Sequence, residues 1–226
     1  MPRNRDSFNF LKYLAENVNG NGHADPDRLP SLTDLSDELG ISISSLREQL
    51  EVARALGFVE VRPRTGIRRL PFAFGPPVSE ILSYAIALDR SHFDAYADLR
   101  KKIEADYWHQ AVASLTDQDI QILTELLQRA NKKLHGDPIQ LPHEEHRQLH
   151  LAIFRHVDNP FVTGILEAYW DAYEKVGLNR YERLEYHEEV WSFHQRMVAA
   201  ISAGDFDLGH RALVSHFELI NTRPSE

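Results

Sequence analysis

The chain contains no cysteine, which excludes both a disulfide framework and a zinc finger built on thiolates. Long apolar runs are missing as well. No stretch approaches the ~20 apolar residues that a membrane-spanning helix needs, and the first ten residues lack the apolar core of a signal peptide. We therefore expect a soluble, cytoplasmic protein with no membrane partner.

Negative charge dominates the composition, but it is unevenly distributed along the 226 residues. The formal net charge is −9. Residues 1–75 contain ten basic and ten acidic residues, so the whole acidic excess lies in residues 76–226. Phosphate attraction is a local field, so the neutral N-terminal part is compatible with nucleic-acid binding. Four of its arginines are crowded into eight positions: Arg62, Arg64, Arg68 and Arg69.

Residues 29–70 have the pattern of a winged helix–turn–helix. Leucines at helical spacing predict a first helix that ends at Gly40. A second helix, with apolar residues along one face, is predicted at 42–56. Two β-rich runs joined by a turn rich in Pro, Gly and Arg follow at 58–61 and 67–70. Two helices across a tight turn, followed by a basic hairpin, form a helix–turn–helix with a wing.

The remainder of the chain has a helical pattern. The segment PFAFGPP at 71–77 predicts a linker, because its three prolines and one glycine cannot continue a helix. Six or seven amphipathic helices follow with short breaks, one of them opened by a Thr116/Asp119 capping pair. We therefore predict a mainly α protein with three parts: a winged helix-turn-helix domain at 1–71, a linker at 72–78, and an all-α antiparallel helical bundle at 79–226.

Histidine is concentrated in the predicted bundle, where eleven of the twelve lie beyond residue 90. His146 and His150 are four residues apart on one predicted helix, so both side chains project from the same face. His194 and His216 each lie among apolar residues. A single histidine in such a position is more often a core residue than a metal ligand. We therefore interpret these histidines as metal ligands only when all four are taken together.

Residues 29–70 closely resemble the DNA-binding domain of the GntR family of bacterial transcription regulators. The matching pieces are LPS at 29–31, ELG at 38–40, Arg47-Glu48, ALGFVEVRP at 55–63 and Thr65-Gly66. The resemblance implies a sequence-specific DNA-binding regulator, a repressor rather than an enzyme. The alternative is a winged helix that serves protein contacts only, since a fold does not fix a function.

The docking geometry of this fold places the second helix in the major groove and the wing tip near the backbone or minor groove. Arg47 is the main candidate for a guanine or phosphate contact. Family members often have DNA-contacting arginines at the positions of Thr33 and Ile43, so we expect weaker binding or a different operator. The predicted DNA-contacting residues are Ser42, Ser44, Ser45, Arg47, Arg62, Arg64, Thr65 and Gly66.

Residues 80–220 resemble the FCD ligand-binding domain of the FadR subgroup of GntR regulators. The matching segments are 99–120, 146–153, Asn159-Pro160 and 193–217. Many members bind a divalent metal through an Asp-x-x-x-His pair and two later histidines. Carried over by position, the ligands in this chain are His146, His150, His194 and His216, and His146 stands where the family has the aspartate.

An imidazole in place of a carboxylate changes the metal preference. Four neutral imidazoles suit Zn, Ni, Cu and Fe, whereas carboxylate-rich sites suit Mn and Mg. We therefore predict a divalent transition metal, zinc first and nickel second, whose affinity falls as the pH drops through the histidine range. The alternative is a site of three histidine ligands with His146 turned aside.

In this family the metal usually helps to hold a small carboxylate effector. Arg100 matches an arginine that often lines the pocket, and its guanidinium suits a carboxylate. The alternative is an exposed Arg100 paired with Glu104 on the same helix. Aromatic residues at helical spacing usually belong to the hydrophobic core. Four of them are nevertheless candidates for the cavity wall: Tyr96, Tyr169, Trp170 and Tyr173.

The resemblance thus predicts a homodimer that binds a double-stranded DNA operator. A small organic acid bound near the metal would change the affinity for that operator. Two other functions stay open. In one, the metal ion is itself the effector. In the other, the histidines belong to a helical metalloenzyme, although no His-Glu-x-x-His or other catalytic signature accompanies them.

Overall fold

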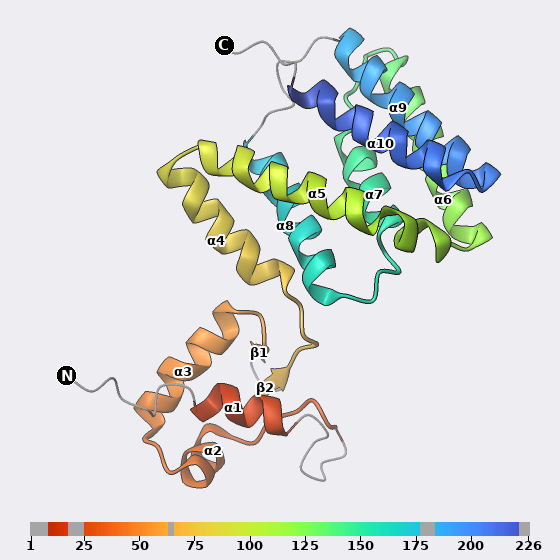
Figure 1. Ribbon diagram of the computed structural model, residues 1–226. Coiled ribbons are helices and arrows are strands. Elements are labelled where there is room, and N and C mark those ends of the chain that lie inside the picture. Colours follow the sequence, from red (N-terminus) through yellow and green to blue (C-terminus); the bar gives the residue numbers. More distant parts are fainter. Residues whose placement is uncertain (1–8, 18–24, 63–65, 177–183, 222–226) are drawn as a thin grey trace. The chain divides into compact units, whose positions relative to one another are not determined.

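The structure is a computed structural model that describes residues 9–17, 25–62, 66–176 and 184–221. Over these residues the chain forms ten α-helices and one two-stranded sheet, so the predicted mainly α fold is confirmed (Figure 1). The chain divides into two compact units, Met1–Pro77 and Val78–Glu226. None of the described helices is both long and apolar enough to cross a membrane.

The first unit has the element order of a winged helix. Its described elements are α1 (Asn9–Glu16), α2 (Leu32–Leu39), α3 (Ile43–Ala55), β1 (Val59–Arg62) and β2 (Gly66–Arg69). The two strands are antiparallel, with Val59 opposite Arg69 and Arg62 opposite Gly66. Each element contributes apolar side chains to one small core, which includes Phe10, Leu35, Leu46, Ala53, Val59 and Ile67.

The turn between α2 and α3 is fixed by local capping. Ser31 and Asp34 form a reciprocal capping box at the start of α2. Gly40 ends that helix with a φ of 65°, a left-handed conformation that glycine adopts without strain. The Ser42 hydroxyl then accepts a hydrogen bond from the Ser45 amide at 3.2 Å and caps α3. The first turn of α3 is therefore held firmly by its own residues.

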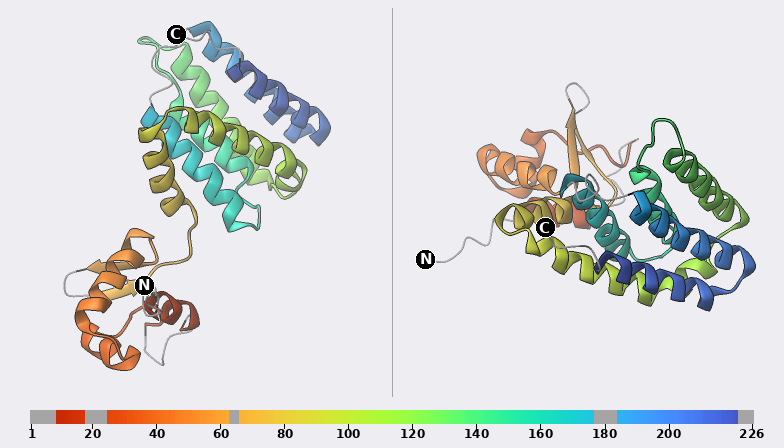
Figure 2. Two further views of the ribbon diagram at one scale, coloured as in Figure 1. Left: turned by 60° about the vertical axis from the view of Figure 1, so that its left-hand side comes forward. Right: turned by 90° about the horizontal axis from the view of Figure 1, so that it is seen from above.

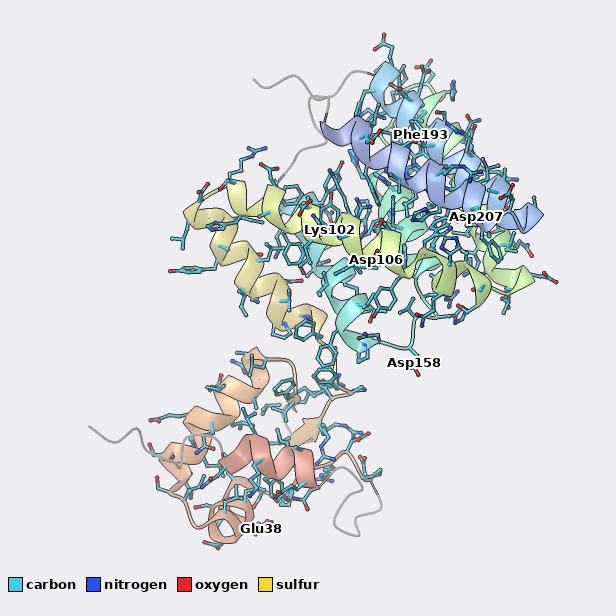
Figure 3. The ribbon with its side chains drawn as sticks, viewed as in Figure 1. Glu38, Lys102, Asp106, Asp158, Phe193 and Asp207 are labelled. Atoms are coloured by element: carbon cyan, nitrogen blue, oxygen red, sulfur yellow. The ribbon has the colours of Figure 1, made fainter. Side chains whose placement is uncertain are left out.

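The remaining helices form a bundle in the second unit. The first of them, α4, begins at Gly75, shortly before that unit starts at Val78. The helices are α4 (Gly75–Leu88), α5 (Ser91–Ala113), α6 (Asp117–Leu134), α7 (His143–Ile153), α8 (Pro160–Val176), α9 (Leu184–Ala203) and α10 (Phe206–Asn221). A short turn joins α9 to α10, which lie side by side (Figure 2). Buried residues of α5 to α10 make a continuous core around Trp108, Leu123, Leu149, Leu166 and Leu213. Acidic side chains such as Asp106, Asp158 and Asp207 lie on the surface (Figure 3).

One predicted helix start is confirmed by the structure, and another helix begins earlier than predicted. The Thr116/Asp119 capping box at the start of α6 is confirmed, with both of its hydrogen bonds present. The break predicted at 71–77 is shorter than expected, because α4 already begins at Gly75. Pro76 and Pro77 occupy the first turn of that helix, where the missing amide hydrogens have no partner within the helix.

Candidate metal centre and DNA-reading surface

Four histidines from three helices converge in the bundle. His146 and His150 lie on α7, His194 on α9 and His216 on α10. One ring nitrogen from each lies within 4.8 Å of those of the others. His150, His194 and His216 are fully buried, and His146 lines a pocket that reaches the cluster. The structure therefore brings together all four residues that the sequence predicted as ligands.

Regular helix geometry and one short turn account for this convergence. A spacing of four residues places His146 and His150 on the same face of α7, with ring centroids 5.1 Å apart. Gly204, with a φ of 73°, makes the turn that returns the chain from α9 to α10. The rings of His194 and His216 then lie with centroids 4.6 Å apart.

The imidazoles are neutral, and several of their nitrogens have no hydrogen-bond partner. Burial, and then the neighbouring imidazoles and Arg100, lower the pKa of His146, His194 and His216 well below the usual value. Within the described residues, Nε2 of His146, Nδ1 of His194 and both nitrogens of His216 lack a partner. Buried polar atoms are rarely left in that state. Neutral imidazoles with free nitrogens are the donors that a divalent transition metal accepts, so the residues fit such an ion.

A buried carboxylate on α5 contacts one of the four histidines. Glu104 is completely buried. One of its oxygens accepts a hydrogen bond from Arg100 Nε at 2.7 Å, and the other lies 3.1 Å from His150 Nδ1. Burial alone would raise the pKa of Glu104, but Arg100 and His150 outweigh burial and hold the pKa below its usual value. Glu104 is therefore ionised, and no feature of its sequence context distinguished it from a surface residue.

Arg100 is buried and faces the same pocket. Only 1% of its surface is exposed. The alternative of an exposed Arg100 paired with Glu104 is therefore wrong about the exposure, but the ion pair with Glu104 is present. The guanidinium carbon lies 4.7 Å from the centre of the Tyr169 ring and 5.1 Å from that of Phe217. Its Nη1 atom is buried and has no hydrogen-bond partner among the described residues. A donor in this position suits an anionic ligand.

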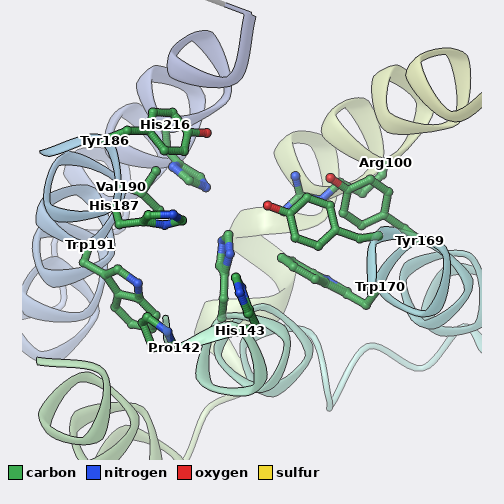
Figure 4. A pocket seen from close by; sticks show the side chains of 12 residues that line it. Arg100, Pro142, His143, Tyr169, Trp170, Tyr186, His187, Val190, Trp191 and His216 are labelled. Atoms are coloured by element: carbon green, nitrogen blue, oxygen red, sulfur yellow. The ribbon is translucent and has the colours of Figure 1, made fainter. Parts of the chain in front are cut away.

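The pocket beside the histidines is narrow. Its cavity volume is about 10 Å³, close to the space that one water molecule occupies. Side chains of α9 and α10 line one side, and Arg100, Tyr169 and Trp170 face them (Figure 4). Of the four aromatic residues proposed for the wall, all except Tyr96 line this pocket. Sequence reasoning missed six lining residues from α9 and the start of α7: Pro142, His143, Tyr186, His187, Val190 and Trp191.

A second cavity of about 240 Å³ adjoins the first one. The two share His143, Trp170 and Tyr173 in their walls. Lys133 and Arg147 also line the larger cavity, but each already forms an ion pair, with Glu145 and Asp171 respectively. The aromatic pair Trp170 and Tyr173 therefore separates the histidine centre from a space large enough for several non-hydrogen atoms.

The exposed side of α3 contains most of the predicted base-reading residues. Ser44 and Arg47 are exposed on its first two turns, Ser45 is half-buried, and the Ser42 hydroxyl is engaged as the helix cap. Ile43, the first residue of the helix, is 37% exposed. It does not belong to the core of the first unit. This face thus presents one cation, small hydroxyls and one apolar side chain.

The wing offers fewer free cations than its sequence indicates. Arg62 pairs with Glu60 at 2.9 Å, and Arg68 pairs with Asp25 at 2.6 Å. Gly66 is exposed and has a φ of 83°, a conformation that favours glycine. Arg64 and Thr65 lie outside the described residues. Arg47 and the paired Arg62 are therefore the predicted arginine contacts that the structure describes.

Comparison with known proteins places the chain in a family. A family model named FCD domain matches residues 96–219, which is more than half of the chain. The chain belongs to the FCD-domain GntR regulators. The fatty acid metabolism regulator protein of Haemophilus influenzae is 24% identical over 202 residues, covering 87% of this chain and 80% of that protein. The HTH-type transcriptional regulator LutR of Bacillus subtilis is 23% identical over 205 residues, covering 87% and 91%.

One solved structure agrees well with the fold of this GntR regulator. The structure of Streptococcus agalactiae GntR has a TM-score of 0.65 and 16% identity, and the match covers 96% of this chain and 97% of that one. The likeness supports an N-terminal winged helix and a helical C-terminal domain. The family match and the curated relatives, all of them regulators, identify the chain as a DNA-binding transcriptional regulator rather than an enzyme.

The metal-free regulator is expected to lose stability as the medium is acidified. In the unfolded chain the histidines regain their ordinary pKa of about 6.5, whereas burial lowers the pKa of His146, His194 and His216 in the folded protein. Below about pH 6.5 the unfolded state therefore binds more protons, so the free energy of unfolding decreases; above that pH the contribution is fully present. Thermal unfolding of chelator-treated protein between pH 8 and pH 5 measures this decrease, and a constant Tm would contradict it.

Proposed function

We propose that this GntR regulator is a cytoplasmic repressor whose operator affinity is set by a small carboxylate bound at a four-histidine metal centre. The observation that carries the proposal is the convergence of four neutral imidazoles beside a buried arginine whose Nη1 has no partner in the described residues. The proposed cofactor is zinc, with nickel as the second choice.

The metal would be held by His146, His150, His194 and His216. Nitrogens about 2.1 Å from a tetrahedral zinc ion lie ~3.4 Å from one another. The Nε2 atoms of His150 and His194 are already 3.1 Å apart, which supports this assignment. When bound, the ion supplies a positive charge that can polarise and orient a carboxylate.

The proposed effector is a small organic acid. The Arg100 guanidinium can donate from Nη1 to a carboxylate oxygen near the metal. With neutral ligands, a divalent ion and Arg100 contribute three positive charges, and Glu104 balances one of them. The remaining charge favours an anion. Because the inner cavity has a volume of only about 10 Å³, the rest of the acid would extend past Trp170 and Tyr173 into the cavity of about 240 Å³.

One observation favours a second candidate, in which the ion itself is the effector. The cavity beside the histidines matches one water molecule and leaves no room for an organic acid unless Trp170 or Tyr173 moves. A regulator of this kind would respond to metal supply without any acid. Either ligand changes DNA affinity only if it binds one conformation of the regulator better than another.

One experiment separates these functions. Purified regulator is depleted of metal, reloaded with zinc or nickel, and analysed for metal content. Its affinity for DNA from upstream of its gene is then measured with and without a panel of mono- and dicarboxylic acids. An acid effect that needs the metal supports the first proposal, and an effect of the metal alone supports the second. Failure to take up stoichiometric transition metal would overturn both.

We also propose that the regulator binds its operator as a homodimer, which suits the two half-sites of a palindromic operator. The described part of α4 exposes Ile81, Tyr84 and Leu88 at helical spacing, each about two-thirds exposed. An apolar stripe of this kind is typical of a surface that associates. Sedimentation analysis tests the proposal, and a Tyr84→Glu variant is expected to shift the protein towards a monomer. A wild-type protein that is monomeric at all concentrations would contradict it.

The operator is expected to contain thymine where the first turn of α3 meets the major groove. Ile43 is exposed there and can contact the thymine methyl group. An arginine at this position would instead hydrogen-bond to guanine. Replacing that dT with dU in an operator selected from random DNA removes one methyl. We expect binding about fourfold weaker, equivalent to roughly 0.8 kcal/mol for one buried methyl group. An Ile43→Ala variant should bind both DNAs equally, whereas equal binding by the wild type would refute this contact.

A further inference from the structure

Glu104 is a single carboxylate that joins the two functional parts of the centre. It is completely buried on α5, and its two oxygens contact different partners. Oε1 accepts from Arg100 Nε at 2.7 Å, and Oε2 lies 3.1 Å from His150 Nδ1. Arg100 is the proposed anion donor, and His150 is a proposed metal ligand.

The contact with Glu104 lies on one side of the His150 ring. Nδ1 has two polar neighbours, Glu104 Oε2 at 3.1 Å and Arg100 Nη2 at 3.0 Å. Nε2 faces the other histidines and lies 3.1 Å from His194 Nε2, so it is the nitrogen offered to a metal. With a metal on Nε2, the ring carries its proton on Nδ1 and can donate it to Glu104. Metal-binding histidines commonly donate their second nitrogen to a carboxylate in this way, which fixes the ring and increases its basicity.

The contact with Arg100 has a parallel effect. Because Nε donates a hydrogen bond to Glu104, the guanidinium plane is held in one orientation between the rings of Tyr169 and Phe217. Its Nη1 atom keeps its hydrogens for another acceptor. The ligand set contains no carboxylate, because His146 is an imidazole, yet Glu104 keeps one negative charge in contact with a ligand.

We propose that Glu104 is a positioning residue that prepares His150 for the metal and Arg100 for the anion. This inference rests on the proposed metal centre and adds to it the nitrogen of His150 that binds the ion and a dependence of the metal affinity on Glu104. A purely structural Arg100–Glu104 ion pair would stabilise the fold but would not change the metal affinity.

The test compares two buried carboxylates. Glu104→Gln keeps the size of the side chain and removes its charge. Glu145→Gln is the matched control, because Glu145 is also buried, lies on α7 and pairs with Lys133 at 2.7 Å. Zinc affinity is measured by competition with a chromophoric chelator, and the Tm of each metal-free variant is recorded. We expect Glu104→Gln to bind zinc about 10- to 100-fold more weakly than wild type. The control should bind zinc like wild type, even if its Tm is lower.

If a folded Glu104→Gln variant binds zinc as tightly as wild type, the positioning role of Glu104 is overturned and the proposed metal centre still stands. If wild-type protein takes up no metal, the metal centre and the positioning role fail together. A second measurement does not depend on the folding of a variant: nitrogen NMR of the zinc-loaded wild-type protein reports which nitrogen of His150 binds the ion. Zinc on Nε2 is expected, and zinc on Nδ1, the atom that faces Glu104, would refute the inference.

Discussion

Replacing His216 with alanine is expected to weaken zinc binding at this centre severely. The side chain is fully buried, neither of its nitrogens has a partner among the described residues, and one of them lies within 4.8 Å of the other proposed donors. Structural zinc sites derive ~10–16 kcal/mol from four ligands, so the loss of one should weaken binding on the order of 100-fold or more. Metal content after desalting and chelator competition measure this loss.

His210→Ala is the control for this prediction because His210 lies on the same helix. Its Nε2 contacts the backbone carbonyl of Ala105 at 3.2 Å, outside the group of four. We expect this variant to bind zinc like wild type. A His216→Ala variant that keeps one tightly bound zinc ion per chain would show that the centre lies elsewhere.

The companion variant His146→Asp distinguishes four histidine ligands from three. If His146 is a ligand, a carboxylate at this position adds a harder donor, so the affinity for Mn²⁺ relative to Zn²⁺ should rise. If His146 is turned aside, the ratio of the two affinities should stay close to that of wild type. Competition between the two ions in one sample gives this ratio directly.

Replacing Arg47 with alanine is expected to weaken operator binding by about 5- to 150-fold. Arg47 is exposed on the second turn of α3 and forms no ion pair within the described part of the chain. One good bidentate contact with a base is worth ~1–3 kcal/mol, which corresponds to that range. Fluorescence anisotropy with a labelled operator measures the change.

The matched control for this prediction is Arg54→Ala. Arg54 lies on the last turn of the same helix and pairs with Glu51 at 2.7 Å. We expect its removal to change operator affinity far less than removal of Arg47, because Arg54 lies at the opposite end of the helix from the residues that face the bases and its charge is already paired with Glu51. If both variants lose affinity equally, the whole helix contributes through its charge and Arg47 has no special role.

Elements with a local cause were predictable from the sequence. Helical spacing and the residues Gly40 and Ser42 defined the turn of the winged helix, because capping depends on neighbouring residues. The four histidines were predicted from the resemblance to the FCD domain, and the spacing of four between His146 and His150 placed them on one face. That His194 and His216 meet them follows from the packing of α9 and α10 in the bundle.

Contacts between distant segments were not predictable in the same way. The Arg100–Glu104 spacing is the same for a surface pair and for a buried one, and only the packing of Tyr169, Trp170 and Phe217 over Arg100 decides between them. Arg68 was counted as a wing cation, but its partner Asp25 lies 43 residues away in the sequence. Pro76 and Pro77 indicated a break, whereas a first helical turn accepts proline.

The ion pairs of the wing determine how strongly operator binding should respond to ionic strength. Each phosphate that a protein cation neutralises releases counterions from DNA, and the affinity then falls with rising salt concentration at a slope of about −0.9 per phosphate on logarithmic axes. Arg62 and Arg68 are already neutralised by Glu60 and Asp25, so each must give up an internal partner before it displaces a counterion. The regulator should therefore keep more of its DNA affinity in concentrated salt than a wing of four free arginines would.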